Sequence, residues 1–289
     1  MTTRSWIGGF SNDSLSTADD WSPAGAPAPG DALVMGNGTA SLDGGDLAGD
    51  TLAIDADTSA AEPYAATINL SGGAELSALV SHTALVEQQA TFNVDGQATL
   101  NLQVQANSLA NTTVTENIAP DSTLSGSFLA NGHDPSVTVN GADDTAQFAN
   151  TGDSGIANGV AVINADVTGT GSFTALPFSG IMFMGSVGDG QTVNSDGFDR
   201  ITIANPDLFQ GLVAFAGGPT NTVDLLGVAA DSYSYQDDML SLYQGGQVVD
   251  TLRLQTDPSQ FQVSESARGV SITGLPGTPP PGAVVLPQV

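Results

Sequence analysis

Short runs of alternating apolar and polar residues recur along this chain, and Gly, Asn, Asp or Pro stands at most of their ends. In residues 98–104, the apolar Leu100, Leu102 and Val104 are separated by polar residues. Successive residues of a strand point to opposite faces, so this pattern predicts a strand with one buried face. Comparable patterns occur in segments 39–42, 51–55, 66–70, 75–80, 90–95, 113–115, 127–129 and 137–140.

A dense series of short β-prone segments lies in residues 163–224, with no helical period between them. Strand centres along the chain are roughly ten to fifteen residues apart, near the range of all-β proteins. The simplest structure that buries such strands is a chain coiled and stacked on itself. We therefore predict an all-β fold, mainly a right-handed parallel β-solenoid. Residues 83–90 alone have reasonable helix propensity, and we expect a local excursion there, or a strand that continues into Thr91.

Residues 1–60 are interpreted as an N-terminal cap with the first rungs, and residues 61–226 as the solenoid body. Trp6 and Trp21 flank a polar turn in the cap segment, and Pro29-Gly30-Asp31 precedes a strand. A solenoid needs such a cap because its first rung would otherwise expose apolar side chains and an open strand edge. An alternative is that the two indole rings stack on sugars.

Residues 227–274 are interpreted as a C-terminal hairpin and capping region. The segment from Leu240 to Leu254 predicts a β-hairpin about the turn Gly245-Gly246. Antiparallel strands at this end would block further stacking of parallel rungs.

Residues 275–289 form a Pro-rich tail with a short apolar strand. The three consecutive prolines 279–281 favour an extended segment. The strand that follows is a candidate for self-assembly, because it can add to a sheet edge of another copy. Its residues are Ala283, Val284, Val285 and Leu286. A frayed terminus is the alternative.

The charge balance excludes several partners. The chain has 31 acidic residues and four basic ones, all Arg, for a formal net charge of −27. Nucleic acids and anionic membranes are therefore not expected as partners, because phosphate binding needs Lys and Arg. The acidic surface is either simply solvated or takes up Ca²⁺ or cationic partners. No cofactor is predicted, structural Ca²⁺ stays possible, and no metal site can be named because the β-roll repeat for Ca²⁺ is missing.

Three features bear on location. The chain has no Cys, so disulfides and thiolate sites are excluded. It has no apolar run long enough for a membrane span. Residues 1–6 lack the apolar core of a signal peptide. With abundant Gly, Asn, Asp and Thr, this composition resembles exported bacterial proteins, so we expect an extracellular or cell-surface protein exported without an N-terminal signal peptide.

Catalytic constellations are not recognisable in the sequence, and we expect no enzyme. The two histidines, His82 and His133, are far apart and lack metal-site spacing. Outside the cap, the adjacent acid pairs are 143–144 and 237–238, and neighbours on one strand point to opposite faces. A polysaccharide-cleaving β-helix, which would need two facing carboxylates, remains the alternative.

Two stretches resemble a known family. The opening, Trp6 followed by Ala18-Asp-Asp-Trp-Ser-Pro23 and Pro29-Gly-Asp-Ala32, resembles the start of large exported proteins of acetic-acid and related alphaproteobacteria. Asn205-Pro-Asp-Leu-Phe-Gln-Gly211 and Thr222-Val-Asp-Leu225 are similar to the closing module of their β-helical adhesin and autotransporter-passenger-like members. The resemblance covers less than half of the chain. It implies a β-helical architecture and a surface location.

These observations lead to one expected function and two alternatives. We expect a non-enzymatic exported surface or matrix protein that self-assembles as a homo-oligomer or polymer, such as a filament, or that mediates adhesion, with surface polysaccharide as a possible partner. The first alternative is a carbohydrate-binding or polysaccharide-cleaving β-helix. The second is a receptor-binding fibre module.

Overall fold

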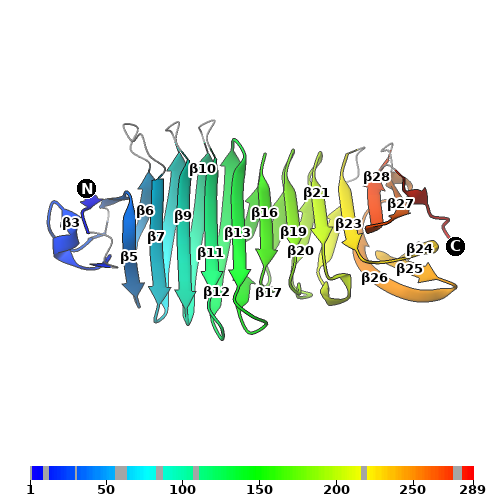
Figure 1. Cartoon of the computed structure of the whole chain (residues 1–289), viewed down its shortest axis with the longest axis horizontal. Coiled ribbons are helices and arrows are strands. Elements are labelled where there is room, and N and C mark those ends of the chain that lie inside the picture. Colours follow the sequence, from blue (N-terminus) through cyan, green and yellow to red (C-terminus); the bar gives the residue numbers. More distant parts are fainter. Residues whose placement is uncertain are drawn as a thin grey trace.

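The chain folds into a β-solenoid of about eight turns, closed at each end by irregular or antiparallel segments (Figure 1). This is a computed structural model, and it describes residues 2–8, 13–29, 31–55, 64–82, 87–106, 111–215, 220–275 and 282–289. The predicted all-β parallel solenoid with an N-terminal cap and a C-terminal hairpin region is confirmed.

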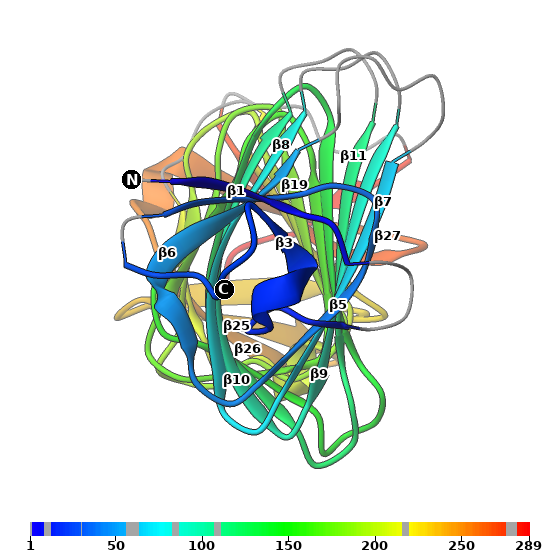
Figure 2. The same cartoon turned by 90° about the vertical axis from the view of Figure 1, so that its left-hand side faces the viewer.

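Two sheets face each other across the core, and the end-on view in Figure 2 looks along the space between them. In the described residues the first sheet has 16 strands. From the N-terminal end they are β3 (Trp21–Ser22), β1 (Thr3–Trp6), β4 (Ala32–Met35), β6 (Asp46–Asp55), β8 (Ala74–His82), β10 (Gln97–Ala106), β12 (Thr123–Gly132), β15 (Asp153–Ile156), β18 (Ser172–Ala175), β20 (Thr192–Ser195), β22 (Leu212–Phe215), β26 (Gln247–Gln255), β25 (Met239–Gln244) and β24 (Ser232–Gln236). In addition, β14 (Gln147–Asn150) pairs with β12, and β17 (Asp166–Thr168) pairs with β14.

The second sheet has 13 strands in the described residues. They are β2 (Asp13–Ser14), β5 (Gly38–Asp43), β7 (Tyr64–Ser71), β9 (Gln88–Asp95), β11 (Thr112–Ile118), β13 (Pro135–Gly141), β16 (Val160–Asn164), β19 (Gly180–Phe183), β21 (Arg200–Ile203), β23 (Thr222–Leu226), β28 (Gly269–Gly274), β27 (Phe261–Ser266) and β29 (Val284–Val285). Three 3₁₀ turns complete the elements: η1 (Ala18–Asp20), η2 (Pro206–Leu208) and η3 (Pro258–Gln260).

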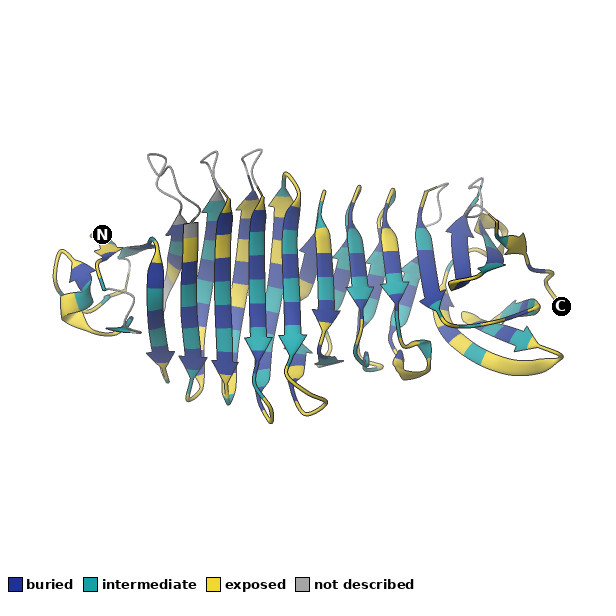
Figure 3. Ribbon diagram, in the orientation of Figure 1, coloured by how far each residue is buried: buried dark blue, intermediate teal, exposed yellow. Residues whose placement is uncertain are grey.

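Each rung contributes one strand or a broken strand to each sheet, and successive rungs pair in parallel and in register. Thr67, for example, lies beside Thr91, and Leu100 beside Leu76. The predicted strand at residues 98–104 is β10, in which Leu100, Leu102 and Val104 are buried. Figure 3 shows the alternation of buried and more exposed residues along the strands. Period-two patterning therefore supplies the core from both sheets.

The segment with helix propensity is only partly described. Residues 83–86 lie outside the described residues, whereas residues 88–90 belong to strand β9. The expected continuation into Thr91 is therefore confirmed for the second half of this segment.

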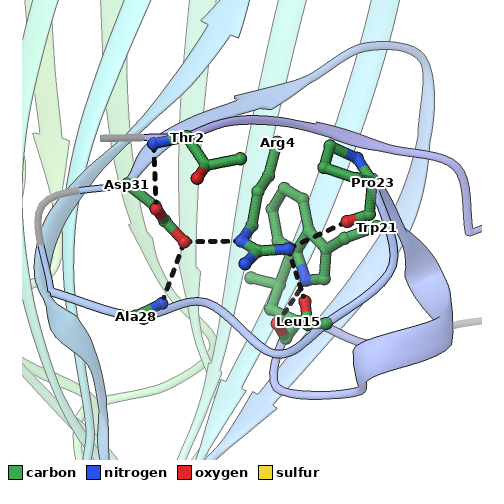
Figure 4. A network of polar contacts seen from close by, with 8 residues as sticks. Thr2, Arg4, Leu15, Trp21, Pro23, Ala28 and Asp31 are labelled. Carbon is green, nitrogen blue, oxygen red and sulfur yellow. Dashed lines mark hydrogen bonds and ion pairs between the residues drawn. The ribbon is translucent and has the colours of Figure 1, made fainter.

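A buried aromatic pair and an ion pair organise the N-terminal cap, and Figure 4 shows the ion pair together with Trp21. Trp6 and Trp21 meet edge to face at 5.3 Å, and the Trp21 indole N–H donates to the carbonyl of Leu15 at 2.8 Å. Both side chains are buried, so stacking on a sugar is ruled out for the fully enclosed Trp21. The anchoring interpretation of the two Trp residues agrees with this burial.

The C-terminal end is closed by antiparallel strands and by the tail. The hairpin predicted about Gly245-Gly246 is confirmed as β25 and β26. Further on, β29 pairs antiparallel with β27 of the same chain, and the backbone of Tyr233 in β24 exchanges hydrogen bonds with Pro287 and Val289. The tail is thus bonded to both sheets.

Candidate functional site

The outward face of the second sheet carries a column of threonines. These are Thr39, Thr67, Thr91, Thr115 and Thr138, which are consecutive register partners on β5, β7, β9, β11 and β13. Each is half-buried, as expected for a side chain on the solvent face of a closely packed sheet. Because neighbouring strands are about 4.8 Å apart, the column repeats at that interval along the rod.

A second column lies two residues further along the same strands. It contains Asn69, Asn93, Asn117 and Asn140, preceded by Ser41 and continued in register by Asn164 on β16. The side-chain amide of each later Asn donates to the amide oxygen of the one before it, at 2.8, 3.0 and 3.1 Å. These hydrogen bonds fix the rungs relative to one another. We call the two columns together the Thr–Asn band.

The threonine hydroxyls of the band are available to a ligand. Among the described residues, none of these five hydroxyl groups has a hydrogen-bond partner in the protein. The flanking outward position on the same strands is also small or uncharged. It holds Ala65, Gln89, Thr113, Ser136 and Val160. Figure 1 shows strands β5, β7, β9, β11, β13 and β16 side by side and nearly parallel. The result is an even, regular surface.

The Thr–Asn band has no charged side chain, on a chain with a formal charge of −27. The carboxylates nearest to it along the strands are Asp43 and Asp95, exposed at strand ends, while Glu116 of β11 points into the core. The threonine column ends at β13, because its register position holds Val162 on β16 and Met182 on β19. A neutral surface in this setting is the opposite of what composition alone predicts.

The alternation of apolar and polar residues predicts these strands but does not predict the band. The signal that could have revealed it is the recurring triplet Thr-x-Asn at residues 67–69, 91–93, 115–117 and 138–140. The triplets stand 24, 24 and 23 residues apart. That interval is one full rung, whereas the spacing between predicted strand centres is about half a rung.

Glu116 is an acidic side chain enclosed in the core. It is 2% exposed, lies in register between Phe92 and Val139, and its Oε2 atom has no hydrogen-bond partner. Burial raises the pKa of this carboxyl to about 8. The group is therefore mostly neutral at pH 7, and burial alone, with no neighbouring charge among the described residues, accounts for the raised pKa.

Two exposed phenylalanines on consecutive turns have their rings in contact, tilted by 32° to each other. The rings of Phe178 and Phe198 are 5.4 Å apart, and the backbone N–H of Phe178 donates to the carbonyl of Phe198 at 2.9 Å. Both residues have a positive φ, of 62° and 58°, at a turn position where the preceding rung has Asn158. Such a conformation is unusual for an aromatic residue. Sequence reasoning did not single out this pair.

A shallow groove of about 1200 Å³ lies near the C-terminal end of the second sheet. Arg200 and Arg268 line it, and Arg200 is ion-paired at 2.5 Å with the buried Asp224, which also accepts a hydrogen bond from Ser271. The carboxylate of Asp224 is thus fully engaged. The groove offers positive charge but no pair of carboxylates for acid–base chemistry.

The residues predicted for self-assembly lie in the docked tail. Val284 and Val285 form β29 on β27, Ala283 is half-buried beside them, and Leu286 is buried in the core. Strand addition to a sheet edge therefore takes place here within one chain. Its use between copies stays a prediction.

No group of three or more metal-binding side chains is present among the described residues. Structural Ca²⁺ therefore stays a prediction without an assigned site. Searches against protein-family models, curated proteins and solved structures find no significant match. In the described part of the chain, no helix has the length and apolarity needed to cross a membrane.

Proposed function

We propose that this chain is a non-enzymatic, elongated protein of the cell exterior that adheres to an extended, ordered surface through the Thr–Asn band. The observation that carries this proposal is the band itself: an uncharged, regular array with unpartnered hydroxyls on a strongly acidic rod. The resemblance to exported β-helical surface proteins supports the external location.

The regularity of the array argues for a solid ligand. Each threonine offers one weak contact, and five such contacts add up only if the ligand presents matching groups at the same interval. A small soluble molecule would cover one or two rungs, whereas an ordered surface covers them all. The interlocked Asn column reduces the loss of conformational freedom on binding.

The test is co-sedimentation with ordered solids, crystalline cellulose, chitin and ice among them. The band variant replaces Thr91 and Thr115 by Tyr, which suits a strand but breaks the even surface. The matched control replaces Thr99 and Ser125 by Tyr, because these register partners occupy the same kind of half-buried outward position on the first sheet. We expect wild type and control to bind one of the solids and the band variant to lose binding. Equal binding by all three proteins would overturn the proposal.

Self-assembly is the second part of this proposal, and the docking of β29 on β27 supports it. Because the tail residues are joined to the body by main-chain hydrogen bonds, the tail of one copy can replace that of another with the same bonds. Light scattering over a concentration series tests this exchange. A chain that stays monomeric at high concentration, with its tail intact, would contradict it.

Binding of a neutral carbohydrate is the second candidate function, favoured by the exposed pair Phe178 and Phe198. Aromatic rings present an apolar face on which a sugar ring can pack. Replacing both residues by Asn, which suits their backbone conformation, should abolish polysaccharide binding without unfolding the chain. Retained polysaccharide binding would contradict this candidate.

A further inference from the structure

The chemistry of the Thr–Asn band narrows the class of surface that it can bind. The band and its flanking column, as described, contain no aromatic side chain on which a sugar ring could pack. They contain no Arg or Lys for phosphate, sulfate or carboxylate groups, and no carboxylate for a mineral cation. What they offer is hydroxyls, amides and methyl groups in a fixed array.

Such an array suits a surface made of water. A threonine hydroxyl is one donor and two acceptors, so it can replace a water molecule without requiring a fixed polarity of its neighbours. Its methyl group favours ordered water beside it. Carboxylates hold strongly oriented hydration shells, and their exclusion from the band leaves the adjacent water free to adopt a lattice arrangement.

The side chains of the two columns also repeat at fixed intervals. The threonines repeat at the strand interval of about 4.8 Å, a short and regular spacing that a crystalline surface can meet at every rung. The parallel column two residues along each strand is about 6.6 Å away, so the band is a two-dimensional array and not a single line. The five threonines together cover about 20 Å along the rod.

We infer that the ordered solid bound by the Thr–Asn band is ice. This inference rests on the proposed function, because it names the surface to which the same band adheres. Five unpartnered hydroxyls, an adjacent Asn column locked by hydrogen bonds of 2.8–3.1 Å, and the exclusion of charge are the observations that carry it. The stacking of rungs sets the periodicity, so no further cofactor or partner is required.

To test this inference, an ice hemisphere is grown slowly in a dilute solution of the protein. The measured quantity is the protein concentration in the ice relative to that in the remaining liquid. We expect wild type and the Thr99→Tyr/Ser125→Tyr control to be enriched in ice roughly tenfold over an inert acidic protein, because the contacts add over several rungs. The Thr91→Tyr/Thr115→Tyr variant should fall to the level of the inert protein. Circular dichroism and thermal melting verify that each variant is folded, and the single Thr115→Tyr variant replaces the double one if that fails to fold.

Different outcomes separate this inference from the proposed function. Exclusion of the wild type from ice, together with band-dependent binding to a crystalline polysaccharide, would overturn the inference and leave the proposed function standing. Enrichment that is equally reduced by the first-sheet control would overturn it too, because the band would then have no special role. If the band variant binds every solid as well as the wild type does, both the inference and the proposed function are overturned.

Discussion

Arg4 and Asp31 form an ion pair of 2.5 Å that fastens the first strand of the chain to the turn that precedes β4 (Figure 4). The same guanidinium donates to the carbonyls of Pro23 and Gly25, and the carboxylate also accepts from the backbone of Thr2 and Ala28. One side-chain pair thus joins four segments of the cap. Arg4 and Asp31 form the ion pair of the cap in the described residues, so the stability of the cap should depend on them.

The hydrogen bond from Arg4 holds the pKa of Asp31 below its usual value of 3.8. A lowered pKa in the folded state means that the pair stabilises the protein above about pH 3.8, and that this contribution is lost as the pH falls further. Arg4→Leu should lower the melting temperature at pH 7 and weaken the acid-induced decrease below pH 4. Melting curves of both proteins between pH 7 and pH 2 measure this. Parallel curves at a constant offset would contradict the assigned role.

Glu116 should give the opposite pH dependence. Its pKa is raised from 4.5 to about 8, so folding becomes less favourable as the pH rises between these values and the unfolded chain releases its proton. Glu116→Gln should therefore stabilise the protein at pH 7 by about 3 kcal/mol, and little at pH 4.5. Denaturant unfolding at the two pH values measures the difference. Glu75→Gln, at an exposed position of β8, is the control, and an equal gain in it would refute the explanation.

Gly126 and Gly73 both have a positive φ, but only at Gly126 would an added Cβ atom collide with the adjacent rung. A Cβ atom at Gly126, with φ of 132°, would lie 2.0 Å from the carbonyl oxygen of Leu100 in the adjacent rung. At Gly73, with φ of 83°, a Cβ atom would meet nothing within 4 Å. Gly73→Ala should cost about 1 kcal/mol, and Gly126→Ala clearly more, because the rungs must move apart. Equal losses in unfolding free energy would show that the close approach is unimportant.

The tail should stabilise the fold, because Leu286 packs into the hydrophobic core. Leu286 is 6% exposed, whereas Val284, two residues before it, is 65% exposed. Leu286→Ala should lower the free energy of unfolding by about 2–3 kcal/mol, and Val284→Ala by less than about 0.5. Denaturant unfolding compares the two. Similar small effects would mean that the tail is only loosely docked, which would favour its exchange between copies.

Much of the fold follows from side-chain alternation, and the rest depends on contacts between distant rungs. Leu100, Leu102 and Val104 predict a strand with one buried face, and Gly245-Gly246 predicts a hairpin turn, because these signals are local. The break between β14 and β15 is not local. Asn150 ends β14 at this break, and its side-chain amide donates a hydrogen bond to the amide oxygen of Gln191, 41 residues away. No spacing in the sequence indicates that these two residues meet.

The candidate site was hidden for a related reason. Thr91 and Asn93 look like ordinary outward residues of a strand, and only the register with Thr115 and Asn117 makes them part of an array. The sequence also does not predict which strand the tail pairs with. Val284 and Val285 pair with β27 through main-chain hydrogen bonds, and these bonds would be the same with β27 of another copy.

The amide ladder of the second sheet runs in a single direction. Asn93 donates to Asn69, Asn117 to Asn93, and Asn140 to Asn117, so every donor comes from the rung nearer the C-terminus. The aligned amide dipoles reinforce one another, as in any hydrogen-bonded chain. This face consequently has a head and a tail, and whatever lattice or second copy lies on it would meet an oriented surface, with two inequivalent ways of lying along the rod.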